Sequence, residues 1–154
     1  NSAIALDTKS PLPYINRGVS YRYLKEYGKA LADHDLAIAL DPSGAACPGC
    51  PKGAAYGERG ATYLWLGKCE QAKADFEKAL ELDGNVAVPY AQLAVYWWTC
   101  RQNKEKALDW FERSFKRGFE DWEELSMETD YGHFLQGLND GPEFKELLRK
   151  YGKK

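Results

Sequence analysis

The sequence repeats itself at a spacing of 42 residues, and this repeat constrains the fold more than any other feature. Ten residues between positions 14 and 41 recur in one register between positions 56 and 83, far beyond chance. In the first copy they are Tyr14, Arg17, Gly18, Tyr21, Leu24, Ala30, Asp33, Ala37, Leu40 and Asp41. Self-similarity at a fixed period of this length is the signature of stacked structural repeats. The sequence therefore predicts a helical repeat protein.

Each copy has the apolar spacing of two amphipathic helices joined by a short turn. In the first copy we expect helices over residues 14 to about 26 and 30–40, with Tyr27 and Gly28 in the turn between them. In the second copy we expect helices over residues 54–67 and 70–82. Each pair of helices would form one antiparallel hairpin.

A second spacing shows that extra residues separate the two copies. The run Ala-Ile-Ala-Leu-Asp occurs at positions 3–7 and again at 37–41, a spacing of 34 residues. The spacing of 42 exceeds it by eight, so residues 45–52 are predicted to be a loop insert. This insert contains the pair Cys47 and Cys50, separated by Pro-Gly.

A third, degenerate copy follows, in which Tyr90, Ala94 and Trp97 fill the slots of Tyr56, Gly60 and Tyr63. The pattern changes after Gly118, where we expect helices near 119–125 and 130–138 and a last one opening at residues 141–142. The predicted segments of the single domain, 1–154, are the end of a preceding repeat (1–10), repeat 1 (11–44), the insert (45–52), repeat 2 (53–86), repeat 3 (87–120) and a helical cap (121–154). Because the first segment is half a repeat, the chain is expected to begin inside a repeat, as a processed or excised segment would.

These residues resemble the tetratricopeptide repeat. Its eight signature slots are matched by Tyr14, Arg17, Gly18, Tyr21, Ala30, His34, Ala37 and Pro42, with Arg17 in a slot that is more often apolar. The end of the chain is similar to the cap of many bacterial arrays through Trp122, Leu125, Asp130, Leu138, Phe144 and Leu147. The resemblance implies an all-α superhelix of antiparallel helix pairs. It also implies a non-catalytic scaffold for protein binding, without naming a partner.

Most of the recurring residues are expected to serve packing. The glycine that recurs in the first helix of each copy must be small because two helices approach closely there. Arg17 with Asp33, and Arg59 with Asp75, recur sixteen residues apart across each hairpin. We interpret both pairs as structural ion pairs.

The first helix of each repeat lines the concave wall of such a superhelix. The residues predicted to line this groove are Ile15, Val19, Arg22, Tyr23, Glu58, Ala61, Trp65, Gln92, Val95 and Trp98. Its aromatic members are expected to gather toward one end as anchors for an extended or helical peptide. The alternative is that Trp65 and Trp98 only pack against an adjacent repeat or the cap.

One known specificity of the family is not expected here. Tetratricopeptide domains that bind chaperone tails hold a terminal carboxylate with Lys, Asn and Arg in the groove. In this chain the corresponding slots carry Ile15, Val19, Glu58, Val88 and Gln92.

The cysteine pair of the insert leaves several interpretations open. Cys47 and Cys50 could close a small disulfide, remain free thiols, or bind a metal or exchange disulfides. A complete zinc site within the chain is not expected, because Cys69 and Cys100 belong to turns at the opposite ends of the helices. A second bridge between Cys69 and Cys100 is conceivable.

Composition excludes other classes of function. The 21 basic and 23 acidic residues give a formal charge of -2 without long runs of either sign, which argues against a nucleic-acid or anionic-membrane surface. Residues 84–100 form the longest uncharged run, too short and too polar to span a membrane. Of the two histidines, His34 takes an aromatic packing slot and His133 has no nucleophile at a meaningful spacing. We expect no enzymatic activity, cofactor or metal.

The sequence therefore favours a scaffold that binds a peptide or a segment of a partner protein. The alternatives are a thiol-dependent module that uses the loop of Cys47 and Cys50, or a self-assembling array that forms homo-oligomers through uncovered repeat ends. The cysteines lean weakly toward an exported or periplasmic location, with the cytoplasm as the other choice.

Overall fold

A computed structural model of the chain describes residues 10–45, 50–119 and 134–151. Within these residues the regular secondary structure is entirely α-helical, which confirms the predicted fold class. The chain divides into two compact units, residues 1–84 and 85–154, and each is described by itself. The helices that the structure describes are all too short or too polar to cross a membrane.

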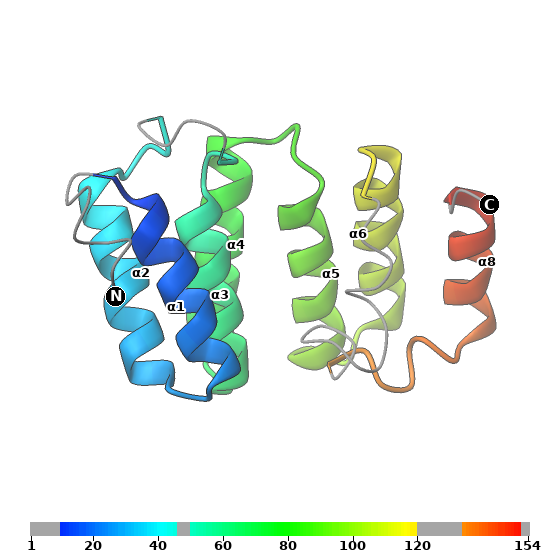
Figure 1. The fold of residues 1–154 in the computed structure, drawn as a ribbon. Coiled ribbons are helices and arrows are strands. Elements are labelled where there is room, and N and C mark those ends of the chain that lie inside the picture. The colour runs from blue at the N-terminus through cyan, green and yellow to red at the C-terminus, as the bar shows by residue number, and fades with distance from the viewer. Residues whose placement is uncertain (1–9, 46–49, 120–133, 152–154) are drawn as a thin grey trace. The chain divides into compact units, whose positions relative to one another are not determined.

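The first unit contains two helical hairpins (Figure 1). Helices α1 (Leu12–Tyr23) and α2 (Tyr27–Leu40) form the first, and α3 (Ala54–Trp65) and α4 (Cys69–Leu82) form the second. The partners of each hairpin pack on each other, and α3 also packs on α2 and α1. The hairpins correspond to the two copies of the sequence pattern.

The turns inside the two hairpins have the same backbone geometry at the same slot. Lys25 and Gly67, which are 42 residues apart, both adopt left-handed conformations, with φ of 60° and 68°. The prediction that Tyr27 and Gly28 form the first turn is wrong, because α2 already begins at Tyr27. Lys25 ends the preceding helix despite the steric cost of a left-handed conformation for a residue with a Cβ.

Close helix contacts explain the recurring glycines. A Cβ on Gly60 would lie 2.6 Å from Phe76 Cε1, and a Cβ on Gly18 would lie 2.6 Å from His34 Cδ2. Phe76 and His34 are both fully buried. The second helix of each hairpin thus presses a ring onto the backbone of the first, which only a residue without a side chain permits.

The second unit contains helices α5 (Val88–Thr99), α6 (Lys104–Lys116) and α8 (Pro142–Tyr151). The turn between α5 and α6 is one residue longer than the earlier turns, as predicted, and Gln102 takes the left-handed conformation there, with φ of 51°. The Asn103 side chain accepts a hydrogen bond of 2.9 Å from the backbone N–H of Lys106 and caps α6.

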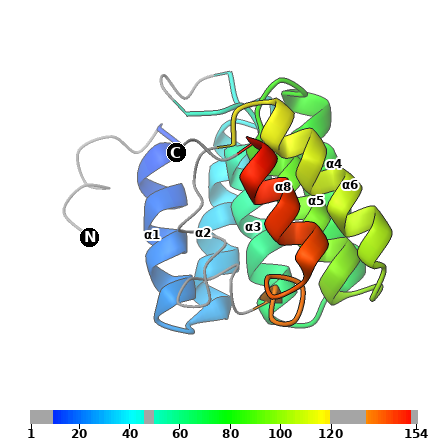
Figure 2. The same cartoon turned by 90° about the vertical axis from the view of Figure 1, so that its right-hand side faces the viewer.

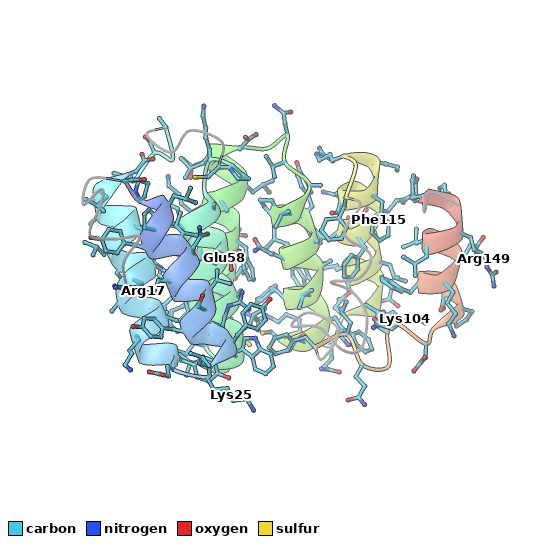
Figure 3. The ribbon with its side chains drawn as sticks, viewed as in Figure 1. Arg17, Lys25, Glu58, Lys104, Phe115 and Arg149 are labelled. Carbon is cyan, nitrogen blue, oxygen red and sulfur yellow. The ribbon has the colours of Figure 1, made fainter. Side chains whose placement is uncertain are left out.

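Helix α8 lies beside α6 (Figure 2). The two helices pack through aromatic rings. The Phe144 ring lies 5.1 Å from Phe111, edge to face, and 6.5 Å from Phe115, which is labelled in Figure 3. The Glu112 carboxylate accepts hydrogen bonds from Lys150 and Tyr151, so that the pKa of Glu112 falls to about 2. The predicted last helix is confirmed.

The region before α8 differs from the sequence prediction where it can be compared. Residues 135–140 form turns, so the helix expected over 130–138 does not reach its predicted end. The expected helix at 119–125 falls almost wholly outside the described residues. The same is true of the cap positions Trp122, Leu125 and Asp130, and of His133.

Candidate functional site

The recurring arginine and aspartate of each hairpin lie in direct contact. Arg59 donates two hydrogen bonds to Asp75, of 2.8 and 2.7 Å, and Arg17 donates two to Asp33, of 2.6 and 2.5 Å. Arg59 also donates to Asp35 of the preceding hairpin at 2.6 Å. These hydrogen bonds raise the pKa of both arginines, so the pairs join helices and leave little cationic surface for a ligand.

The predicted groove residues of the first unit include an ion pair between repeats. The Arg22 guanidinium of α1 donates a 2.9 Å hydrogen bond to the Glu58 carboxylate of α3. The Arg22 side chain is only 5% exposed, whereas that of Glu58 is 28% exposed. Figure 3 shows Glu58 on the side of α3 next to α1. The positive charge of Arg22 is therefore neutralised by a carboxylate of the same unit.

Aromatic side chains lie at the ends of the first-unit helices, beyond this ion pair. Tyr23, at the end of α1, is 62% exposed, and its ring lies 5.3 Å from the Arg22 guanidinium. Trp65, at the end of α3, is partly buried and stacks on Tyr27, with ring centroids 6.5 Å apart. The neighbouring Leu24 is also exposed. This end of the unit thus offers apolar surface to a partner.

Five of the ten predicted groove residues are buried: Ile15, Arg22, Ala61, Gln92 and Val95. Ile15 belongs to the core of the first unit, where it packs with Tyr14, Ala37 and Ala55. In this structure these five residues therefore have little surface of their own to offer a peptide. Val19, Tyr23, Glu58, Trp65 and Trp98 remain as candidates, because they are at least partly exposed.

Trp98 belongs to the second unit and lies beside the chain that leads into α8. A Cβ on Gly137 would lie 3.7 Å from Trp98 Cζ2, an ordinary van der Waals distance. The neighbouring Thr99 hydroxyl donates a 3.4 Å hydrogen bond to the Phe134 carbonyl. Trp98 is partly buried, so packing against the cap accounts for at least part of its surface.

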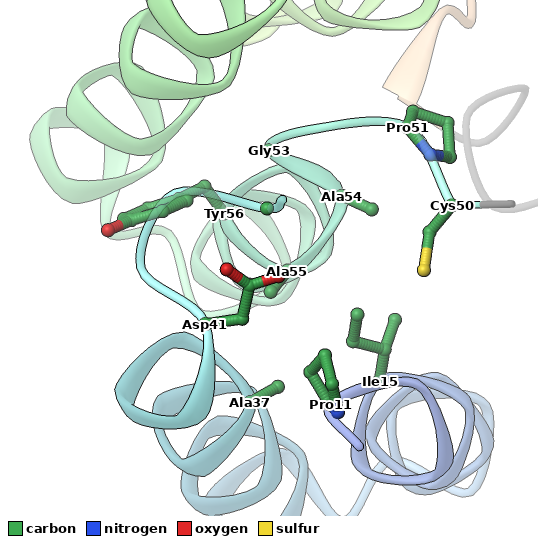
Figure 4. A pocket seen from close by; sticks show the side chains of 11 residues that line it. Pro11, Ile15, Ala37, Asp41, Cys50, Pro51, Gly53, Ala54, Ala55 and Tyr56 are labelled. Carbon is green, nitrogen blue, oxygen red and sulfur yellow. The ribbon is translucent and has the colours of Figure 1, made fainter. Parts of the chain in front are cut away.

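Two hollows in the described residues lie away from the predicted groove positions, apart from Ile15 at the edge of one. The first is enclosed by the starts of α1 and α3 and has a volume of about 10 Å³, the space of one water molecule (Figure 4). The Cys50 side chain points into it. The second, of about 550 Å³, is a shallow depression in the second unit between Asn85 and Val88 on one side and Arg117 and Phe119 on the other.

The cysteines within the described residues are oxidised. Cys50, Cys69 and Cys100 are each disulfide-bonded, so none of the three is the free thiol that the sequence left open. Cys47 lies outside the described residues, and its pairing with Cys50 stays a prediction. In the part of the chain that the structure describes, no three His, Cys, Asp or Glu side chains gather closely enough to hold a metal ion.

The oxidised cysteines predict a simple chemical behaviour. We expect the native chain, unfolded in denaturant without a reductant, to take up no iodoacetamide, because a disulfide sulfur is not nucleophilic. After reduction all four cysteines should be alkylated, which intact-mass measurement counts directly. Uptake of one or more labels before reduction would show that a free thiol exists and would revive the thiol-dependent alternative.

Comparisons with known proteins agree with the repeat pattern. A family model described as tetratricopeptide repeat matches residues 53–86, the segment expected to form the second repeat. Solved structures of tetratricopeptide proteins also share the fold over most of the chain. Residues 53–86 thus match a tetratricopeptide repeat, and the fold of the chain is that of tetratricopeptide proteins. No curated protein matches it.

Three solved structures illustrate this similarity. YrrB, titled a tetratricopeptide protein with an unusual peptide-binding site, is 25% identical with a TM-score of 0.64, covering 97% of this chain and 73% of that one. The first tetratricopeptide domain of Spaghetti (RPAP3), bound to the HSP90 peptide SRMEEVD, is 18% identical with a TM-score of 0.63, covering 86% and 95%. MamA is 20% identical with a TM-score of 0.59, covering 74% of this chain, which spans 61% of the MamA chain.

Proposed function

We propose that this protein is a non-catalytic scaffold that binds a peptide or an exposed segment of a partner protein. The observation that carries the proposal is the apolar surface at the ends of α1 and α3, where Tyr23 is exposed and Trp65 is partly exposed. Large aromatic side chains that are held in place by neighbours are the usual anchors of such interfaces. Trp65 is held in this way by its stacking on Tyr27.

The charges of the first unit favour an apolar or aromatic anchor over an acidic tail. Arg22 is the one cation among the predicted groove residues, and it is almost fully buried against Glu58. A ligand carboxylate would therefore meet the negative charge of Glu58 before it could reach the guanidinium. The RPAP3 domain is titled as bound to an acidic HSP90 peptide. We propose that the present chain selects a different kind of segment.

The test is to select binders from a library of random twelve-residue peptides on the immobilised chain. The affinities of the selected peptides are then measured. We expect peptides rich in aromatic and aliphatic residues. The double variant Tyr23→Ala with Trp65→Ala should bind them at least about 30-fold more weakly, the effect of losing roughly 2 kcal/mol from interface anchors. Circular dichroism would establish that the variant keeps its helices.

The matched control is Leu36→Ala, which removes a side chain of similar exposure, 41%, from α2. This variant should bind within about two-fold of the parent, because the second helices do not contribute to the proposed surface. Equal losses in the two variants, or no loss in either, would count against a binding surface on α1 and α3.

A further inference from the structure

A histidine occupies a core position that is aromatic and apolar in the other repeats. His34 of α2 is fully buried, as are Phe76 and Phe111, which hold the same slot in the second and third copies. The first hairpin thus carries, at the centre of its packing, a group that can gain a proton near neutral pH. Its counterparts cannot.

The surroundings of this ring do not accommodate a charge. Neither His34 Nδ1 nor Nε2 makes a hydrogen bond of good geometry within the described part of the chain. The backbone of α1 closes over the ring at Gly18, where even a Cβ would lie 2.6 Å from His34 Cδ2. A buried imidazolium needs an acceptor for each of its two N–H groups. Within the described residues, neither ring nitrogen has such an acceptor in good hydrogen-bond geometry.

The charges around His34 also oppose its protonation. Burial, and then the positive charge of Arg22, lower the pKa of His34 to about 4, while Asp33, Asp35 and the Ile15 carbonyl act weakly in the other direction. Both carboxylates are already engaged by arginines. The charged groups on α1, α2 and α3 are Arg17 and Arg22 of α1, Lys29, Asp33 and Asp35 of α2, and Glu58 and Arg59 of α3.

We propose that His34 makes the first hairpin an acid-sensitive latch: protonation of the buried ring places a second cation next to Arg22 and drives α1 away from α2. Because Arg22 is held by Glu58 and is followed by Tyr23, this opening disturbs the surface proposed for partner binding. The proposed acid sensitivity of the hairpin depends only on the burial of the His34 ring. The release of a partner rests, in addition, on the proposed function.

The direction of the effect follows from linkage. A histidine in the unfolded chain has a pKa near 6.5, so between about pH 6.5 and 4 the unfolded state binds a proton that the folded state excludes. Stability is therefore complete above about pH 7 and is lost as the pH falls through this window. Between pH 7 and pH 5 the equilibrium constant for unfolding should rise by about 20-fold from this group alone.

The experiment compares urea unfolding of the full chain and of His34→Phe at pH 7 and pH 5. Phenylalanine should fit, because Phe76 meets Gly60 with the same close contact. The unfolding constant should rise about 20-fold for the parent and by less than about three-fold for the variant. The carboxylates and His133 are common to both proteins, so the comparison isolates the contribution of His34. An equal pH dependence in the two proteins would overturn the latch.

Two further measurements keep the outcomes distinct. If His34→Phe does not fold, NMR titration of the parent replaces it: one histidine signal should remain neutral to about pH 4, and two signals titrating near pH 6.5 would overturn the proposal. Affinity for a selected peptide should fall between pH 7 and pH 4, where the folded ring gains its proton, in the parent but not in the variant. Unchanged affinity alongside the expected difference in stability would refute the link to binding and retain the acid-sensitive hairpin.

Discussion

Replacing Phe76 by alanine is expected to lower the free energy of unfolding by about 3–5 kcal/mol, the usual result of truncating a fully buried phenylalanine. Phe76 is completely buried, and its ring lies against the backbone of α3 at Gly60. The cavity would lie between the two helices of the second hairpin. A Cβ on Gly60 would lie only 3.2 Å from the Ala72 carbonyl oxygen, so the two helices have little room to move closer and fill the cavity. Urea unfolding followed by circular dichroism measures the loss.

The control for this prediction is Leu66→Ala, in the turn that follows α3. Leu66 is 39% exposed, so its truncation removes apolar surface without opening a cavity. We expect a loss of about 0.5 kcal/mol or less, as for most surface substitutions. A loss below about 1 kcal/mol for Phe76→Ala itself would mean that the hairpin rearranges around the cavity. The contact at Gly60 would then not be the rigid one that the recurring glycine indicates.

The contacts inside each hairpin could be predicted from the sequence because each copy repeats them. Arg59 and Asp75 recur at the spacing of Arg17 and Asp33, and both pairs are in direct contact in the structure. An antiparallel hairpin with a short turn leaves few ways to align two helices. A residue in one helix therefore identifies the region of the other that it faces.

Contacts between hairpins were predicted less well, because no local spacing defines them. Ile15 and Ala61 lie on the face of the first helices assigned to the groove, yet both are buried by neighbouring helices. Aligning residues with the repeat pattern identifies the face of a helix on which each residue lies. Whether that residue is buried depends on how closely the next helix approaches. The first turn was misplaced for a related reason. Gly28 looks like a helix stop, whereas Lys25 adopts the left-handed conformation through constraints that only the folded hairpin supplies.

Replacing Arg59 by methionine should cost about 3–5 kcal/mol, the usual result of leaving a buried charge without its partner. The Asp75 side chain is 7% exposed, and both of its hydrogen bonds from Arg59 would be lost. Methionine retains most of the aliphatic packing of arginine. The loss of stability therefore reports the removal of the positive charge and its hydrogen bonds. Arg17→Met should cost less, because the Arg17 side chain is 31% exposed and bridges to a single carboxylate, whereas Arg59 also holds Asp35 of the first hairpin.

A double-mutant cycle separates a structural ion pair from a cation that serves a ligand. Adding Asp75→Asn to Arg59→Met removes the unpaired charge, so the double variant should be more stable than Arg59→Met alone, with a coupling of about 1–3 kcal/mol between the two positions. Peptide affinity at pH 7, where the variants remain folded, should stay within about two-fold of the parent, because the pair lies outside the proposed binding surface. The opposite result, unchanged stability with lost binding, would make Arg59 a partner-binding residue. The binding surface would then have to be sought around Asp35 and Asp75 instead of around Tyr23 and Trp65.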